Sequence, residues 1–289
     1  MPKSLIPDLI AASPNRRSFL KTLGAATAGV TAMSLAGVSS AKAATATEVE
    51  VLQFALNLEY LEAEFYTYCV SGYGIQRVGI GVNGSANGSN SPEGGTTTGG
   101  KQVDFPNIAT TIDAAAQIAN DERNHVTLLR SALGADTIAK PNINLNALGL
   151  MTGNVNDFAR QARIFEDIGV SAYAGAAGLL STPAIITYAA RILAAESQHV
   201  AAVRFQIAYY NVSTTALDGA DILPPPDNTP PHILSLNRAN GLCATRTPGE
   251  VLYLAFNGAN LSSGAFFPTG VNGAITASGS GPATSANLN

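Results

Sequence analysis

Two short motifs combine a carboxylate with an imidazole at the same spacing. Glu122 is followed three residues later by His125, and Glu196 is followed three residues later by His199. On an α-helix, residues three apart lie roughly 60° from each other around the axis, so the two side chains point the same way. Such a pair can bind one metal ion. The chain has three histidines, and two of them lie in these motifs.

Two more glutamates recur with a tyrosine at matched spacing. Glu59 is followed seven residues later by Tyr66, and Glu166 is followed seven residues later by Tyr173. Seven residues make nearly two helical turns, so each tyrosine shares a helix face with its glutamate. The chain therefore alternates two patterns, E…Y and ExxH, twice. This is an internal repeat of chemical groups, although the loops between them differ greatly in length.

These residues fall on the apolar faces of four segments with helical periodicity. An isolated ExxH pair is usually a solvated surface pair, and one buried histidine is usually an ordinary core residue. Four glutamates on apolar faces, where an unpaired charge is costly, together with both histidines favour a metal site. We expect helices over residues 47–70, 107–133, 156–180 and 183–210.

The connections indicate how the helices are arranged. Thr182-Pro183 is typical of a helix start, and the tight turn before it makes the third and fourth helices antiparallel neighbours. Residues 135–154 are long enough to cross the length of a bundle. Residues 71–106 are rich in Gly, Ser, Asn and Thr without any apolar period, which predicts a mobile lid or a flexible surface insertion.

The composition changes after about residue 212. Residues 224–231 are rich in proline, and Thr247 with Glu250 forms a capping-box pattern that predicts one short helix. The stretch from about Gly270 is rich in Gly, Ser, Ala and Asn, so we expect it to be frayed. Residues 213–289 are therefore predicted to be an appendage packed on the bundle, with a flexible tail.

The N-terminus resembles a twin-arginine export signal. Arg16-Arg17 precedes Phe19-Leu20-Lys21 and an uncharged segment, which ends at Ala41-Lys42-Ala43. Cleavage after residue 43 would place the mature chain in the periplasm or outside the cell. The resemblance implies export in the folded state, often with a cofactor already bound. An ordinary Sec signal and an uncleaved membrane anchor are the alternatives.

Charge and cysteine content limit the possible partners. Removing residues 1–43 removes five basic residues and one acidic residue, so the net charge changes from -4 to -8. Such a chain is a poor partner for nucleic acid, and we expect no membrane span after cleavage. Cys69 and Cys243 could form a disulfide in an exported protein or remain two buried thiols; the sequence leaves both open.

The combined pattern resembles the ferritin-like superfamily over residues 47–210. In its di-iron carboxylate bundles, two helices each supply one glutamate and the other two each supply an ExxH motif. The superfamily includes bacterioferritins, rubrerythrins and ferritin-like desiccation-related proteins. Residues 57–66, 246–248 and 266–268 look most similar to the last group. The resemblance implies an all-α, antiparallel four-helix bundle over residues 44–212, with one long crossover.

The resemblance also implies a dinuclear metal centre. The two ExxH glutamates would bridge the ions, each remaining glutamate would bind one ion, and each histidine would complete one. Mixed carboxylate and imidazole ligands suit iron or manganese better than zinc. The expected metal ligands are Glu59, Glu122, His125, Glu166, Glu196 and His199. Tyr66 and Tyr173 would hydrogen-bond the ligating carboxylates and orient them.

The remaining acids and the third histidine are assigned no such role. Glu62 could reach the same cavity and substitute for Glu59, or it is an acid at the rim or surface. His232 has no partner at ligand spacing. Three acids fall off the ligand faces and are expected to be solvated, namely Glu64, Asp121 and Asp167.

Several functions are compatible with a dinuclear centre. The first is oxidation of iron(II) by dioxygen or peroxide, or peroxide reduction with an external electron donor, since no four-cysteine rubredoxin-like module is present. A manganese catalase is a variant. The second is a non-catalytic stress or desiccation-related envelope protein with a structural or vestigial metal site. Iron storage in a closed shell is disfavoured, because residues 71–106 and the appendage would need space between subunits; a smaller homo-oligomer stays open.

Overall fold

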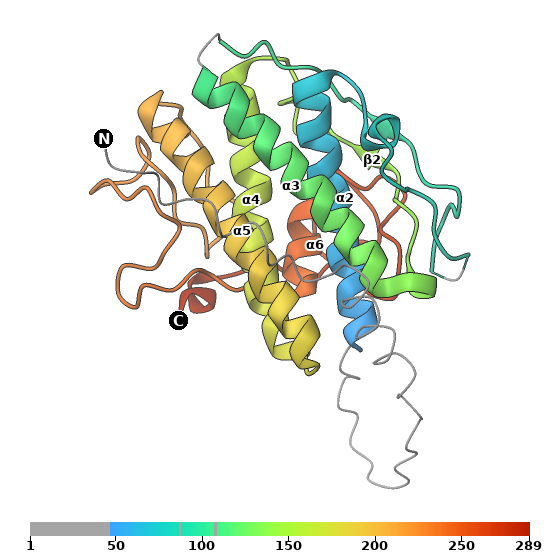
Figure 1. Cartoon of the computed structure of the whole chain (residues 1–289). Coiled ribbons are helices and arrows are strands. Elements are labelled where there is room, and N and C mark those ends of the chain that lie inside the picture. Colours follow the sequence, from blue (N-terminus) through green and yellow to red (C-terminus); the bar gives the residue numbers. More distant parts are fainter. Residues whose placement is uncertain (1–46, 87, 107–108) are drawn as a thin grey trace, which may run out of the picture. The chain divides into compact units, whose positions relative to one another are not determined.

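The computed structural model describes residues 47–86, 88–106 and 109–289. The predicted export signal, residues 1–43, lies outside them. The described part is dominated by helices, and the predicted four-helix pattern is confirmed with small shifts at the ends (Figure 1). The four long helices are α2 (Glu48–Ser71), α3 (Ala109–Leu133), α4 (Val155–Ala176) and α5 (Pro183–Tyr209).

The helices form two antiparallel pairs. α2 packs mainly on α3, and α4 mainly on α5. Figure 1 shows α2 and α5 running in one direction and α3 and α4 in the other. The segment between α3 and α4 must therefore return along the bundle, which makes it the long crossover. This arrangement places α2 antiparallel to α4 and brings apolar faces of all four helices into one core.

The start of α5 is stabilised by the start of α2. Thr182 precedes Pro183 at the first helical position, as predicted. The Thr182 hydroxyl donates to the Glu48 carboxylate instead of capping its own helix. Glu48 also accepts the backbone N–H groups of Ser181 and Thr182. A carboxylate at a helix N-terminus is favourable, so this contact joins the two helix ends.

The Gly-rich loop after α2 is packed rather than free. Ile75 and Val82 are buried, and β1 (Thr97–Thr98) pairs in parallel with β2 (Ile143–Asn144) of the crossover. A Cβ on Gly84 would lie 2.0 Å from a backbone nitrogen of the crossover. Glycine here permits close backbone approach, a use that composition alone cannot distinguish from flexibility.

A buried ion pair also holds this loop, and it corrects one expectation. The Lys140 ammonium donates to the Glu64 carboxylate and to the Thr97 hydroxyl. Glu64 is 1% exposed, so its predicted solvation is wrong. The helical pattern places it off the ligand face correctly, but the loop and crossover cover that side of α2. A buried charge requires such a partner.

The C-terminal region contains α6 (Pro248–Phe256), which begins with the predicted capping box of Thr247 and Glu250. The expected fraying from Gly270 onwards is wrong, because Asn272 is buried and Ala283 is 1% exposed. Asn57 of α2 exchanges two hydrogen bonds with the Asn272 backbone. The Asn57 side-chain amide thus pairs with backbone N–H and C=O groups of an irregular segment, which has no neighbouring strand to bond them.

The segment after α5 is held by buried charges. Asp167 of α4 lies 2.8 Å from Arg163 Nε and accepts a hydrogen bond from Arg204 at 2.7 Å. Arg163 also donates to Asp221, which follows α5. The predicted solvation of Asp167 is therefore wrong. Removing one member of such a network leaves a buried charge without a partner, which is strongly destabilising.

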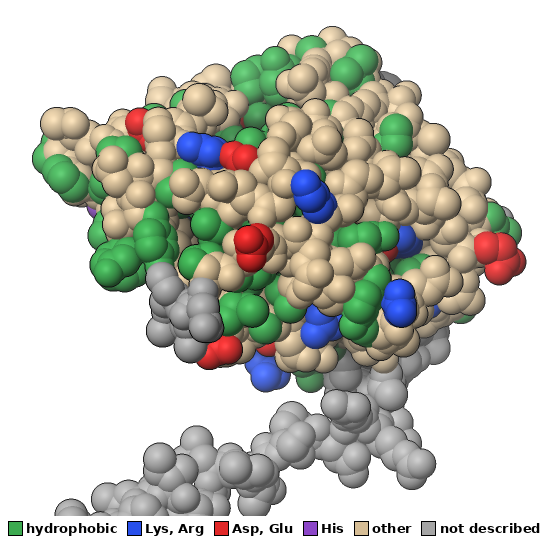
Figure 2. All heavy atoms as spheres, turned by 90° about the horizontal axis from the view of Figure 1, so that it is seen from above, with side chains coloured by type: hydrophobic (Ala, Val, Ile, Leu, Met, Phe, Trp, Pro, Cys, Tyr) green, Lys and Arg blue, Asp and Glu red, His purple; other side chains and the backbone are tan. Residues whose placement is uncertain are grey.

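The outer surface carries few charges. Figure 2 shows one face on which a few acidic and basic side chains, some of them side by side, lie among neutral and hydrophobic ones. Within the described ranges, no helix is both long enough and apolar enough to span a membrane. Cys69 and Cys243 are both free thiols. Burial raises the pKa of the Cys69 thiol, which makes it unreactive.

Candidate metal centre

All six predicted ligands meet inside the bundle. The four glutamates are 0% exposed, and the two histidines are nearly as buried. The third histidine, His232, accepts a hydrogen bond from Arg238 and belongs to no metal-type group among the described residues. The converging side chains are Glu59 from α2, Glu122 and His125 from α3, Glu166 from α4, and Glu196 and His199 from α5.

The ligand atoms form two groups that share two residues. Within each group, one ligand atom from every member lies within 4.8 Å of those from the others. Glu122 and Glu196 belong to both groups, which is the geometry that two bridging carboxylates require. The first group is Glu59, Glu122, His125 and Glu196, and the second is Glu122, Glu166, Glu196 and His199.

His125 lies at the centre of the first group. Its Nδ1 is 3.2 Å from Glu59 Oε2, 3.4 Å from Glu122 Oε2 and 3.2 Å from Glu196 Oε1. A ring nitrogen carries at most one hydrogen, so it cannot serve three oxygens. None of these four atoms makes a hydrogen bond within the described part of the chain. Buried polar atoms without partners are costly, and a cation among them would satisfy all four.

His199 has the same relation to the second group. Its Nδ1 is 2.9 Å from Glu122 Oε1 and 3.5 Å from Glu166 Oε2, while its Nε2 is 3.4 Å from Asp121 Oδ2. The Asp121 side chain is 47% exposed, in line with its predicted solvation. It nevertheless lies where it can orient the ring and leave Nδ1 free for an ion. The sequence pattern gave no signal for this second role.

The charges of the site fit two divalent cations. Burial and the Glu196 charge raise the pKa of Glu122 to about 7, and burial raises the pKa of Glu196 to about 8. Burial lowers the pKa of His199, but the Glu122 and Glu166 carboxylates outweigh it and raise the pKa to about 12. Four close carboxylates thus repel one another and hold protons, and two dications would neutralise them.

Each tyrosine bonds the glutamate of the opposite helix. The Tyr66 hydroxyl donates to Glu166 Oε1, and the Tyr173 hydroxyl donates to Glu59 Oε1. Along one helix, seven residues span about 10 Å, so the glutamate of the same helix is out of reach. Antiparallel α2 and α4 bring each tyrosine level with the other glutamate. The second oxygen of both glutamates is unpaired among described residues and faces the ligand groups.

A fifth carboxyl, that of Glu62, lies beside the six predicted ligands. It is 4% exposed, so the prediction of a rim or surface acid is wrong. Burial, followed by the Glu196 charge, raises its pKa well above the usual range. A Cβ on Gly169 would lie 3.0 Å from Glu196 Oε2 and 3.2 Å from Glu62 Oε1. Gly169 follows Glu166 by three residues, as Glu62 follows Glu59, so the two positions are equivalent in the repeat. A glutamate at one of them and a glycine at the other was the sequence signal that could have indicated the burial of Glu62.

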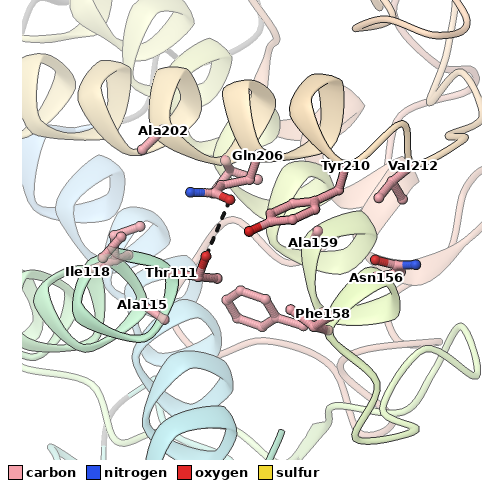
Figure 3. A pocket seen from close by; sticks show the side chains of 13 residues that line it. Thr111, Ala115, Ile118, Asn156, Phe158, Ala159, Ala202, Gln206, Tyr210 and Val212 are labelled. Carbon is pink, nitrogen blue, oxygen red and sulfur yellow. Dashed lines mark hydrogen bonds between the residues drawn. The ribbon is translucent and has the colours of Figure 1, made fainter. Parts of the chain in front are cut away.

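An apolar pocket lies farther along the same helix faces (Figure 3). Its inner wall includes Ile118, one turn before Glu122. The Thr111 hydroxyl spans it with a 3.4 Å hydrogen bond to the Gln206 side chain. No carboxylate or imidazole is among the described residues that line this pocket, and its walls are mainly apolar.

A comparison with known families agrees with this geometry. A family described as a ferritin-like domain matches residues 47–209, more than half of the 289-residue chain. No curated protein and no solved structure gives a significant match. The matched range contains α2 to α5 and every residue of the two ligand groups. This chain therefore belongs to the ferritin-like domain family.

Proposed function

We propose that this protein binds two metal ions, iron in the native state, and oxidises iron(II) with dioxygen or peroxide outside the cytoplasm. The observation that carries the proposal is the set of buried carboxylate and imidazole atoms without hydrogen-bond partners among the described residues, arranged as two groups that share Glu122 and Glu196. Two iron ions held this close supply redox chemistry to a small oxidant when bound.

The protein's own groups have distinct tasks in this proposal. Glu122 and Glu196 hold both ions and release their protons when the ions bind. Tyr66 and Tyr173 each engage one oxygen of a terminal glutamate, which leaves the other oxygen for the ion. Asp121 orients His199. Deep burial keeps bulk water from the site and strengthens every electrostatic contact in it.

A non-catalytic envelope protein is the second candidate. The ligand groups draw on all four helices, so bound ions would stabilise the fold even without turnover. Manganese in the same ligands would favour peroxide disproportionation, a variant of the first proposal.

Two measurements separate these functions. Elemental analysis of protein from its natural host gives the metal and the number of ions per chain. Oxidation of iron(II) by the loaded protein, followed with dioxygen and with peroxide, then tests turnover. Two ions with turnover support the first proposal, and two ions without turnover support the second. A chain that binds no metal contradicts the first proposal and leaves the second with a vestigial site.

Tyr66→Phe should leave the metal content unchanged and slow iron(II) oxidation by about tenfold. The variant removes only the phenolic hydrogen bond to Glu166, so Glu166 keeps its place but loses its orientation. Metal content is measured by elemental analysis and turnover by absorbance. Tyr209→Phe, at an exposed tyrosine of α5, is the control and should behave like wild type. An empty site in Tyr66→Phe would argue against an orienting role.

Export by the twin-arginine route is tested with Arg16→Lys combined with Arg17→Lys. Both positions lie outside the described residues, and the change preserves their charge. We expect uncleaved precursor to accumulate inside the cell, since that route reads the arginine pair itself. Fractionation and immunoblotting measure this. Undiminished export would point instead to a Sec signal, which tolerates lysine.

A further inference from the structure

The Glu62 carboxyl lacks a hydrogen-bond or ion-pair partner in the described part of the chain. It is 96% buried, since only 4% of the residue is exposed. No hydrogen bond or ion pair joins it to any residue in the described ranges. Glu64, two residues later on α2, has both kinds of partner. The carboxyl lines a cavity whose other walls are apolar, which makes it the single polar side chain there. A buried carboxyl in this position needs an occupant that can hydrogen-bond it.

The cavity lies next to the candidate metal centre. Gly169 forms part of its wall, and a Cβ at this position would lie 3.0 Å from Glu196 Oε2. The same point lies 3.2 Å from Glu62 Oε1. The missing side chain therefore leaves a gap between the cavity and a carboxylate of both ligand groups. Any larger residue would separate Glu62 from Glu196.

The C-terminal region forms the outer wall. Val251 and Ala255 of α6 face the cavity, and Phe266 closes it farther along the chain. The chain before α6 is docked tightly on α4, because a Cβ on Gly175 would lie 2.1 Å from the Arg246 carbonyl oxygen. The space that the centre of a water-sized molecule can reach is about 20 Å³. One water needs about 10–15 Å³ on this measure, so a molecule of one or two heavy atoms fits.

We propose that this cavity is a binding subsite for a small hydrogen-bonding oxidant, hydrogen peroxide, which Glu62 holds beside the metal centre. Hydrogen peroxide both donates and accepts hydrogen bonds, as a lone carboxyl between apolar walls requires. Dioxygen donates none and accepts poorly, so it gains little from Glu62. The inference rests on the proposed function and specifies its oxidant.

The test compares binding with turnover. Crystals of the full-length mature chain loaded with redox-inactive zinc(II) are soaked in hydrogen peroxide. We expect a bound molecule within hydrogen-bond distance of Glu62 in wild type and none in Ala255→Leu, which fills the cavity from α6. In solution, the KM for peroxide in iron(II) oxidation should rise about tenfold in Glu62→Leu and Ala255→Leu. The rate with dioxygen should stay unchanged in Ala255→Leu, and Glu62→Gln should restore most of the peroxide response lost in Glu62→Leu.

The control and the opposing outcomes are distinct. Ala189→Leu alters a separate apolar groove beside Tyr173. It should change neither the KM for peroxide nor the rate with dioxygen. An empty cavity in soaked wild-type crystals, or equal losses with both oxidants, would overturn the subsite. If no variant and no wild-type protein oxidises iron(II), the proposed function fails, while the soaked crystals still decide whether the cavity binds peroxide.

Discussion

Glu122→Ala and Glu196→Ala should each abolish dinuclear binding, because each carboxylate contributes to both ligand groups. Glu59→Ala and Glu166→Ala should instead lose one ion, since each disrupts only one group. We expect the affinity for the second ion to fall by at least about 100-fold in the bridging variants. Elemental analysis after desalting counts the ions, and calorimetric titration gives the affinities.

An exposed acid on the same helix provides the control. Asp113 of α3 faces solvent, so Asp113→Ala should bind two ions like wild type. Two ions per chain in Glu122→Ala would disprove the bridging assignment. Stability offers an independent readout, because Glu122→Gln relieves carboxylate repulsion. It should stabilise the metal-free protein and destabilise the metal-loaded one, whereas a purely structural glutamate would give the same sign in both.

Metal removal should lower stability strongly, and the loss should grow with pH. Ions at about 1,000 times their dissociation constant stabilise the folded state by about 4 kcal/mol. In a domain of this size, that corresponds to roughly 10 °C in the unfolding temperature. Thermal unfolding followed by circular dichroism, with chelator or with iron(II) under anaerobic conditions, measures the difference at pH 5, 7 and 9.

The direction of the pH effect follows from the pKa values. The pKa values of Glu122, about 7, and Glu196, about 8, lie above the ordinary value of 4.5. Between pH 4.5 and these values the folded state keeps protons that the unfolded chain has lost, so the stability of the metal-free protein falls as the pH rises from about 4.5 to about 8. The raised pKa of His199 acts in the same direction above pH 6.5.

Bound ions displace these protons, so the loaded protein should not weaken over this range. Metal affinity should rise with pH for the same reason, because deprotonated ligands bind cations. The variant with Glu122→Gln and Glu196→Gln should lose most of the pH dependence in the metal-free state. A flat profile for metal-free wild type would show that these carboxyls are not held in mutual repulsion.

Local patterns in the chain were sufficient to predict the helices and to choose the six candidate ligands that the fold brings together. The positions of Glu122 and His125 on one face follow from the helical repeat alone, and so do those of Glu196 and His199. Their placement on apolar faces already required a partner of opposite charge. The convergence of six side chains then follows from packing four such faces together, which is why the two motifs and two glutamates predict one centre.

Only the tertiary structure decided which groups meet across helices and which are buried by loops. The antiparallel course of α2 and α4 pairs Tyr66 with Glu166 and Tyr173 with Glu59, a pairing that spacing within either helix does not contain. Glu62 is buried because α6 covers it from far along the chain. The Gly-rich loop and the C-terminal segment have no periodicity, so their packing depends on long-range contacts that no local rule encodes.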